Sequence, residues 1–513
     1  MRHHYYSMRF SVPVKVIVWL LLVQIVVFCV SYFHEQINVN ITVNTDKELE
    51  IEFSSPPKLL GTTDYKALAE AEKTKARLEK LQNLVKKKQQ ADSLKQQSQK
   101  IEVDTSSEAE RIKVHNYSKD SVFALDNFFE ALYAIETHKN KKLIRIAHYG
   151  DSQIEGDRIT LYIRKKFHKQ FGGGGPGFIP VQDILNPPAY SKETSDNWIR
   201  YTMFHDIYVN NKYGYGGLVF RFSSLKNNDS SIKKAYISVS SNKYGNYNKA
   251  TLLWGNAQVP CKVTTTINGV VHEDKLPVQE GFGTLVHQFN AGMPIVRYDF
   301  STTKSPDIYG ICLDDSTGVQ VDNFALRGHG GQGIFKMSAD YLRTQYKALN
   351  TKLIILEYGG NGIPYVTGEE SAAQFEAFFY DMAMFMKKAN PQASILLIGT
   401  ADMAHKVEGN YQSYKGLRMA VNAQKRACQR AGIAFWNLFE VMGGEGSIID
   451  WVNEKPPLAA SDFIHFSEKG CALVAELFYD ALMNEYALFK KRKIEQEAKN
   501  IHKNIDNEVK QLP

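Results

Sequence analysis

The sequence lacks several features that mark common classes of protein. Only five of its 513 residues are cysteine, and a hydrophobic content of 43% supplies a core large enough to fold without disulfides. No histidine, cysteine or carboxylate cluster has the spacing of a metal site, so we expect no metal and no organic cofactor. The formal net charge of +7 is small for this length, and no basic stripe carries interleaved aromatic residues. We therefore expect no nucleic-acid partner.

Four of the cysteines lie in the body of the chain, at positions 261, 312, 428 and 471. In an exported protein they are able to pair, and four cysteines allow three pairings. Cys428 and Cys471 lie in segments with helical patterning, so we expect both to be buried thiols. The pairing stays open on the sequence alone.

An uncharged apolar run, VIVWLLLVQIVVFCVSYF, occupies residues 16–33 and is long enough to cross a bilayer. Basic residues precede the run and acidic residues follow it, so the positive-inside rule places the N-terminus in the cytoplasm. A cleaved signal peptide is the alternative, but its apolar part would be shorter and would end in small residues. We expect a cytoplasmic N-terminus at 1–13, an uncleaved inner-membrane anchor at 14–33, and a body facing the periplasm or the cell exterior.

The rest of the chain divides by composition and periodicity. Residues 34–113 are polar and then rich in Lys, Glu, Gln and Ala without a good heptad seam, which predicts a juxtamembrane segment and a helical stalk. Residues 114–195 and 311–495 alternate strand and helix patterns, which indicates a parallel sheet with helices on both faces. Short alternating runs between Gly and Asn turns predict an inserted β-sandwich at 196–310. Residues 496–513 form a charged tail.

A Gly-Asp-Ser tripeptide ending at Ser152 follows the first predicted strand of the α/β body. The tripeptide alone is a weak signal, because Asp and Ser often bond their own backbone in turns. A serine nucleophile also needs a base and donors for an oxyanion. In an open parallel sheet these groups come from the carboxyl ends of other strands.

Three later segments supply such groups. VDNFALRG ends a predicted strand at Gly328, and LIILEYGGNG ends another strand just before Asn361. SDFIHFSEKG carries Asp462 and His465 directly before the last predicted helix. Each signal is weak by itself, but their order along the chain favours a catalytic constellation.

His148 is a second candidate base, because it lies four residues before Ser152. It falls within a predicted strand, where its side chain would point into the sheet or away from the serine. We therefore expect His465 to be the base.

These four blocks resemble those of the SGNH, or GDSL-like, hydrolase family over roughly residues 114–195 and 311–495. The resemblance implies a flavodoxin-like parallel sheet. It also implies that Ser152 is the nucleophile, that His465 is the base and that Asp462 orients the base.

The same resemblance implies an oxyanion hole built from the backbone N–H groups of Ser152 and Gly328 and the side-chain amide of Asn361. One position departs from the family pattern. Gly362 stands where the family has Asp, so support for the Asn361 side chain must come from elsewhere.

The interval between Ser152 and Gly328 is far longer than one strand–helix unit needs, and the β-rich insert fills it. This arrangement resembles envelope O-acetyl esterases and transferases of peptidoglycan or polysaccharide, in which a carbohydrate-binding-like module interrupts the SGNH domain. Trp254, Tyr244 and Tyr247 of the insert are candidates to stack on sugars, and packing in the core is the alternative.

Three functions stay open. The first is a membrane-anchored serine esterase that removes O-acetyl groups from cell-wall or surface glycan. The second is an O-acetyltransferase that receives acetyl from a membrane acyl-transfer partner and passes it to glycan through the same acyl-enzyme. The third is a non-catalytic envelope protein that binds glycan, against which the intact Ser152, Asn361 and His465 argue.

Overall fold

The computed structural model describes residues 38–43, 49–54, 65–119, 122–185, 187–204, 208–223, 232–241 and 246–511. The expected anchor at 14–33 lies outside these residues and stays a prediction. Among the described helices, none is both long and apolar enough to span a membrane.

The chain forms two compact units, residues 1–86 and residues 87–513. The first unit contains an antiparallel hairpin of β1 (Asn38–Val43) and β2 (Leu49–Ser54), which the sequence interpretation missed. The alternation of polar and apolar residues in NVNITV could have predicted strand β1. Helix α2 (Tyr65–Gln99) follows, as the Lys, Glu, Gln and Ala composition predicts.

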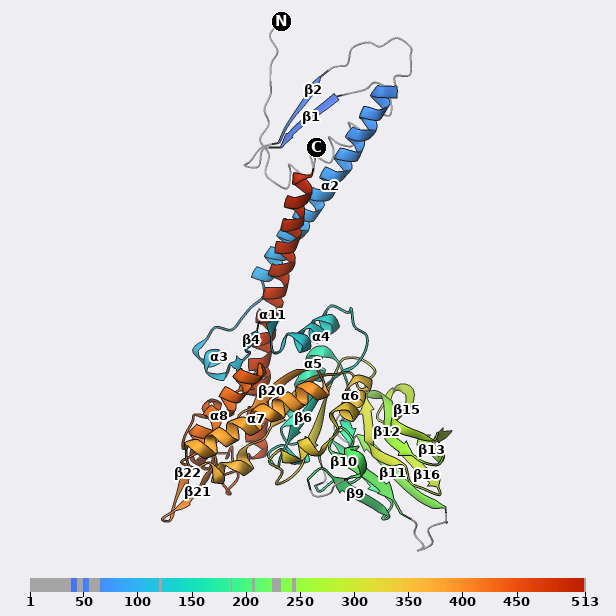
Figure 1. Ribbon diagram of the computed structural model, residues 1–513, viewed down its shortest axis with the longest axis vertical. Helices are drawn as coiled ribbons and strands as arrows, with labels where there is room; N and C mark the ends of the chain where they lie inside the picture. The colour runs from blue at the N-terminus through green and yellow to red at the C-terminus, as the bar shows by residue number, and fades with distance from the viewer. Residues whose placement is uncertain are drawn as a thin grey trace. The chain divides into compact units, whose positions relative to one another are not determined.

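The second unit contains a six-stranded sheet, of which β6 and β20 are labelled in Figure 1. The strand order of this sheet is β18-β6-β19-β20-β23-β3. Five of its strands are parallel. When these five are numbered along the chain, their order across the sheet is 2-1-3-4-5, as in a flavodoxin-like sheet. The antiparallel edge strand β3 pairs with β23. The bounds are β3 (Val114–His115), β6 (Ile144–Gly150), β18 (Val319–Ala325), β19 (Thr351–Glu357), β20 (Ser394–Ile398) and β23 (Ala434–Trp436).

Helices cover both faces of this sheet, as predicted. Alternate residues of each strand enter two separate hydrophobic clusters, because successive side chains of a strand point to opposite faces. Ile355 packs with α4 (Asp126–Glu136), α5 (Thr160–Phe171) and α11 (Glu468–Lys510) in one cluster. Leu356 packs with α6 (Ala339–Ala348), α7 (Glu369–Ala389) and α8 (Leu417–Ala431) in the other.

The insert is a β-sandwich of two antiparallel sheets, as its alternating pattern predicts. One sheet has the order β15-β12-β17-β10-β9 with β7 paired to β17, and the other has the order β14-β13-β16-β11-β8. The bounds are β7 (Gly177–Ile179), β8 (Tyr190–Thr194), β9 (Trp198–Thr202), β10 (Leu218–Phe222), β11 (Lys233–Ser241), β12 (Tyr247–Ala257), β13 (Cys261–Ile267), β14 (Val270–Leu276), β15 (Gln279–Gly292), β16 (Val296–Thr302) and β17 (Asp307–Asp314).

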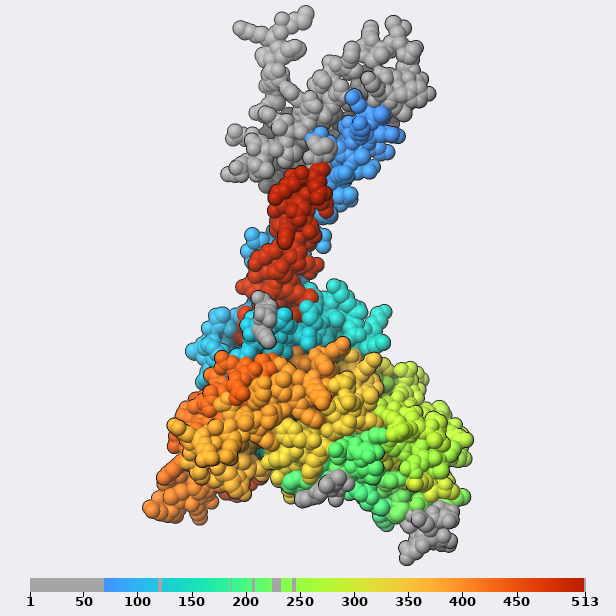
Figure 2. Space-filling model, in the orientation of Figure 1, coloured from blue at the N-terminus to red at the C-terminus, as the bar shows by residue number. Residues whose placement is uncertain are grey.

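The insert is longer than the predicted segment 196–310. Strands β7 and β8 precede residue 196, and β17 continues to Asp314. Strand β7 has only three residues, too few for a recognisable alternation, and it exists because it pairs with β17. The sandwich packs directly against the α/β part, and both contribute to one hydrophobic cluster (Figure 2).

The segment predicted as a charged tail, 496–513, is not separate from the last helix, because α11 continues to Lys510. No Gly or Pro interrupts this segment, so the helix has no reason to end at residue 496. Within the second unit, Lys87 Nζ lies 2.5 Å from Glu508 Oε1. The end of α11 therefore lies beside the C-terminal part of α2.

Short elements connect the layers: α3 (Ser107–Ile112), β4 (Ser118–Lys119), β5 (Val122–Phe123), β21 (Ala404–Val407), β22 (Asn410–Ser413), α9 (Leu438–Met442) and α10 (Ser447–Asn453). The four cysteines of the described residues are free and buried, which confirms the expectation for Cys428 and Cys471. Burial raises the pKa of the Cys471 thiol to about 12.

Candidate active site

The turn after β6 brings Ser152 against His465, although 313 positions separate them in the chain. Ser152 Oγ lies 2.8 Å from His465 Nε2, and His465 Nδ1 lies 2.7 Å from Asp462 Oδ2. Ser152, His465 and Asp462 therefore form a continuous hydrogen-bonded chain at the carboxyl edge of the sheet. The turn that carries Ser152 requires glycine at Gly150, because a Cβ there would lie 2.9 Å from the Glu357 carbonyl oxygen.

The loop that carries His465 is held by its own acid and by a neighbouring hairpin. Asp462 Oδ1 accepts the backbone N–H groups of Ile464 and His465, both at 3.0 Å. Phe463 has a φ of 59°, and its ring stacks on Tyr411 of β22 with centroids 3.5 Å apart. Partial burial acts to raise the pKa of Asp462, but the hydrogen bonds from His465 and Ile464 hold it below its ordinary value. Asp462 is therefore ionised at neutral pH and orients the imidazole.

Asn361 lies in the 3₁₀ turn Gly360–Tyr365 that follows β19. Its Nδ2 donates to Asp151 Oδ2 at 2.9 Å, and Asp151 Oδ1 accepts the Gln153 N–H at 2.9 Å. Asp151 thus supplies the support that the family pattern assigns to an Asp at position 362. The sequence interpretation did not give Asp151 this role, although it is the acid of the Gly-Asp-Ser tripeptide.

Position 362 itself has little room for a side chain. A Cβ on Gly362 would lie 2.8 Å from Cε2 of Phe375, which belongs to α7. A side chain at position 362 would therefore require the Phe375 ring to shift.

Asp151 is buried and its carboxyl carries an unusual pKa. Burial raises the pKa of Asp151 to about 6, and the nearby Glu357 acts in the same direction, while the Gln153 N–H acts against it. Three groups favour the ionised form of Asp151: the Gln153 N–H, His465 through its charge, and the Asn361 amide.

An open cavity of about 910 Å³, including its mouth, surrounds the serine. Ser152, His465 and Asn361 line it together with apolar side chains such as Met403 and Leu438. Gly328 follows β18 with a φ of 69°, but it is not among the described residues that line this cavity. Its role in the oxyanion hole stays a prediction.

His148, the second candidate base, does not contact the serine in the described residues. It is buried in β6, where its Nε2 lies 2.9 Å from Glu357 Oε2 and its Nδ1 lies 3.0 Å from Thr160 Oγ1. The structure therefore brings His465, and not His148, to Ser152, as predicted.

Glu357 and Asp402 also line the serine cavity, and the sequence interpretation named neither. Both are buried, and Glu357 Oε1 and Asp402 Oδ1 have no hydrogen-bond partner among the described residues. Burial raises the pKa of Asp402 above its ordinary value. The sequence could have indicated both residues, because Glu357 ends an apolar strand and Asp402 follows shortly after another.

The aromatic residues proposed for sugar stacking require a correction. Trp254 is only 3% exposed, and Tyr247 is fully buried with its hydroxyl bonded to the Pro294 carbonyl. Both belong to β12, which lies between β15 and β17 and packs into the core. The prediction that they stack on sugars is wrong, because neither ring has an accessible face. Tyr244 lies outside the described residues.

Comparisons with known proteins support the fold but match no family model. No protein-family model and no curated protein matches the chain. A solved structure described as a peptidoglycan O-acetylesterase in action matches with a TM-score of 0.57 and 22% identity, over 73% of this chain and 99% of that chain.

Two further solved structures match with lower TM-scores. A family two carbohydrate esterase from Cellvibrio japonicus has a TM-score of 0.23 and 9% identity, over 58% of this chain and 99% of its own. A family 35 carbohydrate-binding module from Clostridium thermocellum has a TM-score of 0.19 and 14% identity, over 27% and 97%. The fold comparison rests on the esterase with a TM-score of 0.57. The fold that the SGNH resemblance implies is confirmed.

Proposed function

We propose that this protein is a membrane-anchored serine esterase that removes O-acetyl groups from cell-wall glycan, with peptidoglycan as the substrate class. One observation carries the proposal: the hydrogen-bonded chain from Ser152 through His465 to Asp462, in a cavity that Asn361 also lines. The fold shared with a peptidoglycan O-acetylesterase supports the substrate class.

The acylation step follows from these contacts. His465 Nε2 takes the proton of Ser152 Oγ as the oxygen attacks the acetyl carbonyl, and Asp462 stabilises the resulting imidazolium. The carbonyl oxygen becomes an oxyanion that accepts from the Ser152 N–H and the Asn361 amide, with the Gly328 N–H as a third expected donor.

His465 then completes acylation by giving its proton to the departing sugar oxygen, so that the sugar leaves as an alcohol and the acetyl group remains bound to Ser152. Deacylation uses the same groups. His465 then removes a proton from water, the water attacks the acyl carbonyl, and acetate leaves as Ser152 regains its proton.

The location is part of the proposal. The apolar run at 16–33 with basic residues before it supports an inner-membrane anchor and a periplasmic body. Protease added to the periplasmic side of intact inner membrane should digest the body and protect residues near Met1. A body protected in the cytoplasm would overturn the location.

The activity is tested with the full chain in detergent and O-acetylated peptidoglycan as substrate. We expect free acetate as the main product and no release by the Ser152→Ala variant. With a small acetyl ester as donor and glycan oligomers as acceptor, acetylated oligomer as the main product would favour the acetyltransferase. Absence of any acetyl release by the folded parent would favour a non-catalytic glycan-binding protein.

A further inference from the structure

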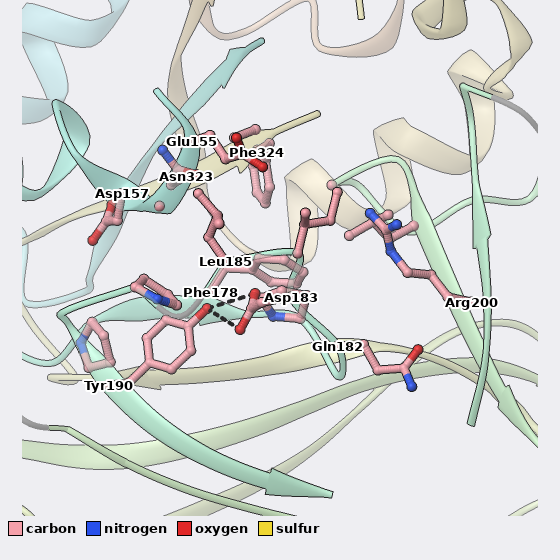
Figure 3. A pocket seen from close by; sticks show the side chains of 18 of the residues that line it. Glu155, Asp157, Phe178, Gln182, Asp183, Leu185, Tyr190, Arg200, Asn323 and Phe324 are labelled. Atoms are coloured by element: carbon pink, nitrogen blue, oxygen red, sulfur yellow. Dashed lines mark hydrogen bonds between the residues drawn. The ribbon is translucent and has the colours of Figure 1, made fainter. Parts of the chain in front are cut away.

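A second hollow lies where the insert meets the carboxyl end of β18 (Figure 3), and its lining shares no residue with that of the serine cavity. Its volume is about 660 Å³ when its mouth and the open solvent there are included. The α/β part contributes Glu155 and Asn323, and the loop between β7 and β8 contributes Gln182, Asp183 and Leu185. The hollow therefore exists only because the insert is folded against the α/β part.

One turn of the chain serves both cavities. Asp151, Ser152 and Gln153 line the serine cavity, whereas Glu155 and Asp157 line the hollow. The Glu155 N–H donates to the Ser152 carbonyl at 3.3 Å, so the two groups of residues are joined in one tight turn. The two cavities are therefore lined by adjacent parts of the same turn.

The charges of the hollow are largely compensated within the protein. Asp157 lies 2.6 Å from Arg164, Asp183 lies 2.5 Å from Lys192, and Glu155 lies 2.8 Å from Arg327. The described residues contain no group of three or more side chains suited to a metal ion. Arg200 also lines the hollow, and its charge acts on Asp183. The hollow thus offers carboxylate lone pairs that accept hydrogen bonds from the hydroxyl groups of a ligand.

The hollow also has an apolar side. Phe178 and Phe324 form buried surface within it, and Leu185 and Ile184 of the insert loop are 41% and 53% exposed beside it. Figure 3 shows Leu185 together with Glu155, Asn323 and Gln182 around the same space. A ligand with a hydroxyl-bearing edge and an apolar C–H face matches this combination, and a neutral sugar ring has both.

We propose that this hollow binds a sugar unit of the glycan chain that neighbours the acetylated unit, an inference that rests on the proposed esterase function. Leu185 packs against the apolar face of the ring, and Gln182 and the carboxylate of Asp183 hydrogen-bond its polar groups. The hollow gives the enzyme affinity for a polymeric substrate and holds the chain while its acetyl group lies at Ser152.

Binding is measured by calorimetric titration of the tetramer of β-1,4-linked N-acetylglucosamine into the full chain in detergent, with Ser152→Ala to prevent turnover. Leu185→Asp places an uncompensated carboxylate against the ring face, and we expect it to raise the Kd at least tenfold. Gln182→Ala removes one hydrogen-bonding group, and we expect a rise of about threefold to tenfold. Val278→Asp is the matched control, since Val278 is a 61% exposed aliphatic residue of the insert outside the hollow, and its Kd should match that of the parent.

The outcomes separate this inference from the proposed function. Absence of tetramer binding, or an equal Kd for the parent, Gln182→Ala and Leu185→Asp, would overturn the sugar site even if the enzyme releases acetate. Binding that both variants weaken, in a protein that releases no acetate, would keep the site and overturn the esterase. If Leu185→Asp fails to fold by circular dichroism, Leu185→Ser and Gln182→Ala decide the outcome.

Discussion

The parallel sheet and the inserted sandwich differ in how far their candidate functional residues are exposed. In the parallel sheet, Ser152 and Asn361 stand just beyond the carboxyl ends of strands and reach a shared cavity. In the sandwich, Trp254 and Tyr247 belong to strand β12, which begins at Tyr247, and both are buried. The layers that cover a residue therefore decide whether it reaches a cavity.

The physical reason lies in how each layer is covered. Helices cover both faces of the parallel sheet, so only its strand ends remain open. Strand β12 has neighbours on both sides and packs into the core, so its large side chains exclude water there. Residues at strand ends should therefore control activity, and residues within the sandwich strands should control stability.

The nucleophile offers the largest expected effect. Ser152→Ala removes covalent catalysis, so acetate release should fall by about 10⁴-fold or more, while the free energy of unfolding in urea should change by less than about 1 kcal/mol. His465→Ala should be similarly severe, and the double variant should be little worse, because the two residues act as a unit. A Ser152→Ala enzyme that keeps most of its activity would contradict the assignment.

Trp254 tests the other side of the comparison. Trp254→Ala leaves a cavity in the sandwich core, so the free energy of unfolding should fall by about 3–5 kcal/mol, measured by urea denaturation with circular dichroism. Val278→Ala, at an exposed position, should change it by no more than about 0.5 kcal/mol. Unchanged stability with weaker glycan binding would restore Trp254 as a sugar-stacking residue.

Asn361 tests the strand-end site apart from its nucleophile. Asn361→Ala removes one oxyanion donor, so kcat should fall by about 10²–10³-fold, or about 2.7–4 kcal/mol. KM should change little, because the donor meets negative charge only in the transition state. Steady-state kinetics on acetylated glycan measures both, and a loss confined to KM would make Asn361 a binding residue.

The smallest expected effect is the contribution of Asp151 to the pH dependence of stability. This contribution decreases as pH rises, whereas that of an ordinary salt-bridged acid increases. Burial raises the pKa of Asp151 from 3.8 to about 6, so the folded protein binds its proton at a pH where the unfolded chain has already lost it. The free energy of unfolding should therefore fall as pH rises from about 4 to about 6, by at most about 3 kcal/mol.

Asp151→Asn is the control for this pH dependence. The amide does not titrate, so the difference in unfolding free energy between parent and variant should change over this pH range and be constant above it. The measurement is urea denaturation at about pH 4 and about pH 7. A difference that is the same at both pH values would show that Asp151 does not titrate between them.

Much of the fold and most of the serine site could be predicted because both depend on local patterns. The alternation of strand and helix patterns predicted the parallel sheet, and short alternating runs predicted the sandwich. Three of the four short blocks at predicted strand ends or helix starts named Ser152, Asn361, Asp462 and His465. Parallel strands place their carboxyl ends at one edge, which brings Ser152 and Asn361 together, whereas Asp462 and His465 do not directly follow a strand of this sheet and lie just before α11.

Only the tertiary structure decided the features that depend on contacts across long sequence separations. Asp151 supports Asn361 across 210 positions, and packing against α7 leaves little room for a side chain at Gly362. Strand β7 exists because β17 pairs with it, and the burial of Trp254 depends on which elements cover β12. The second hollow likewise needs loops from two layers. Residue patterns record the preference of each segment, whereas register and the packing of distant segments decide which atoms meet.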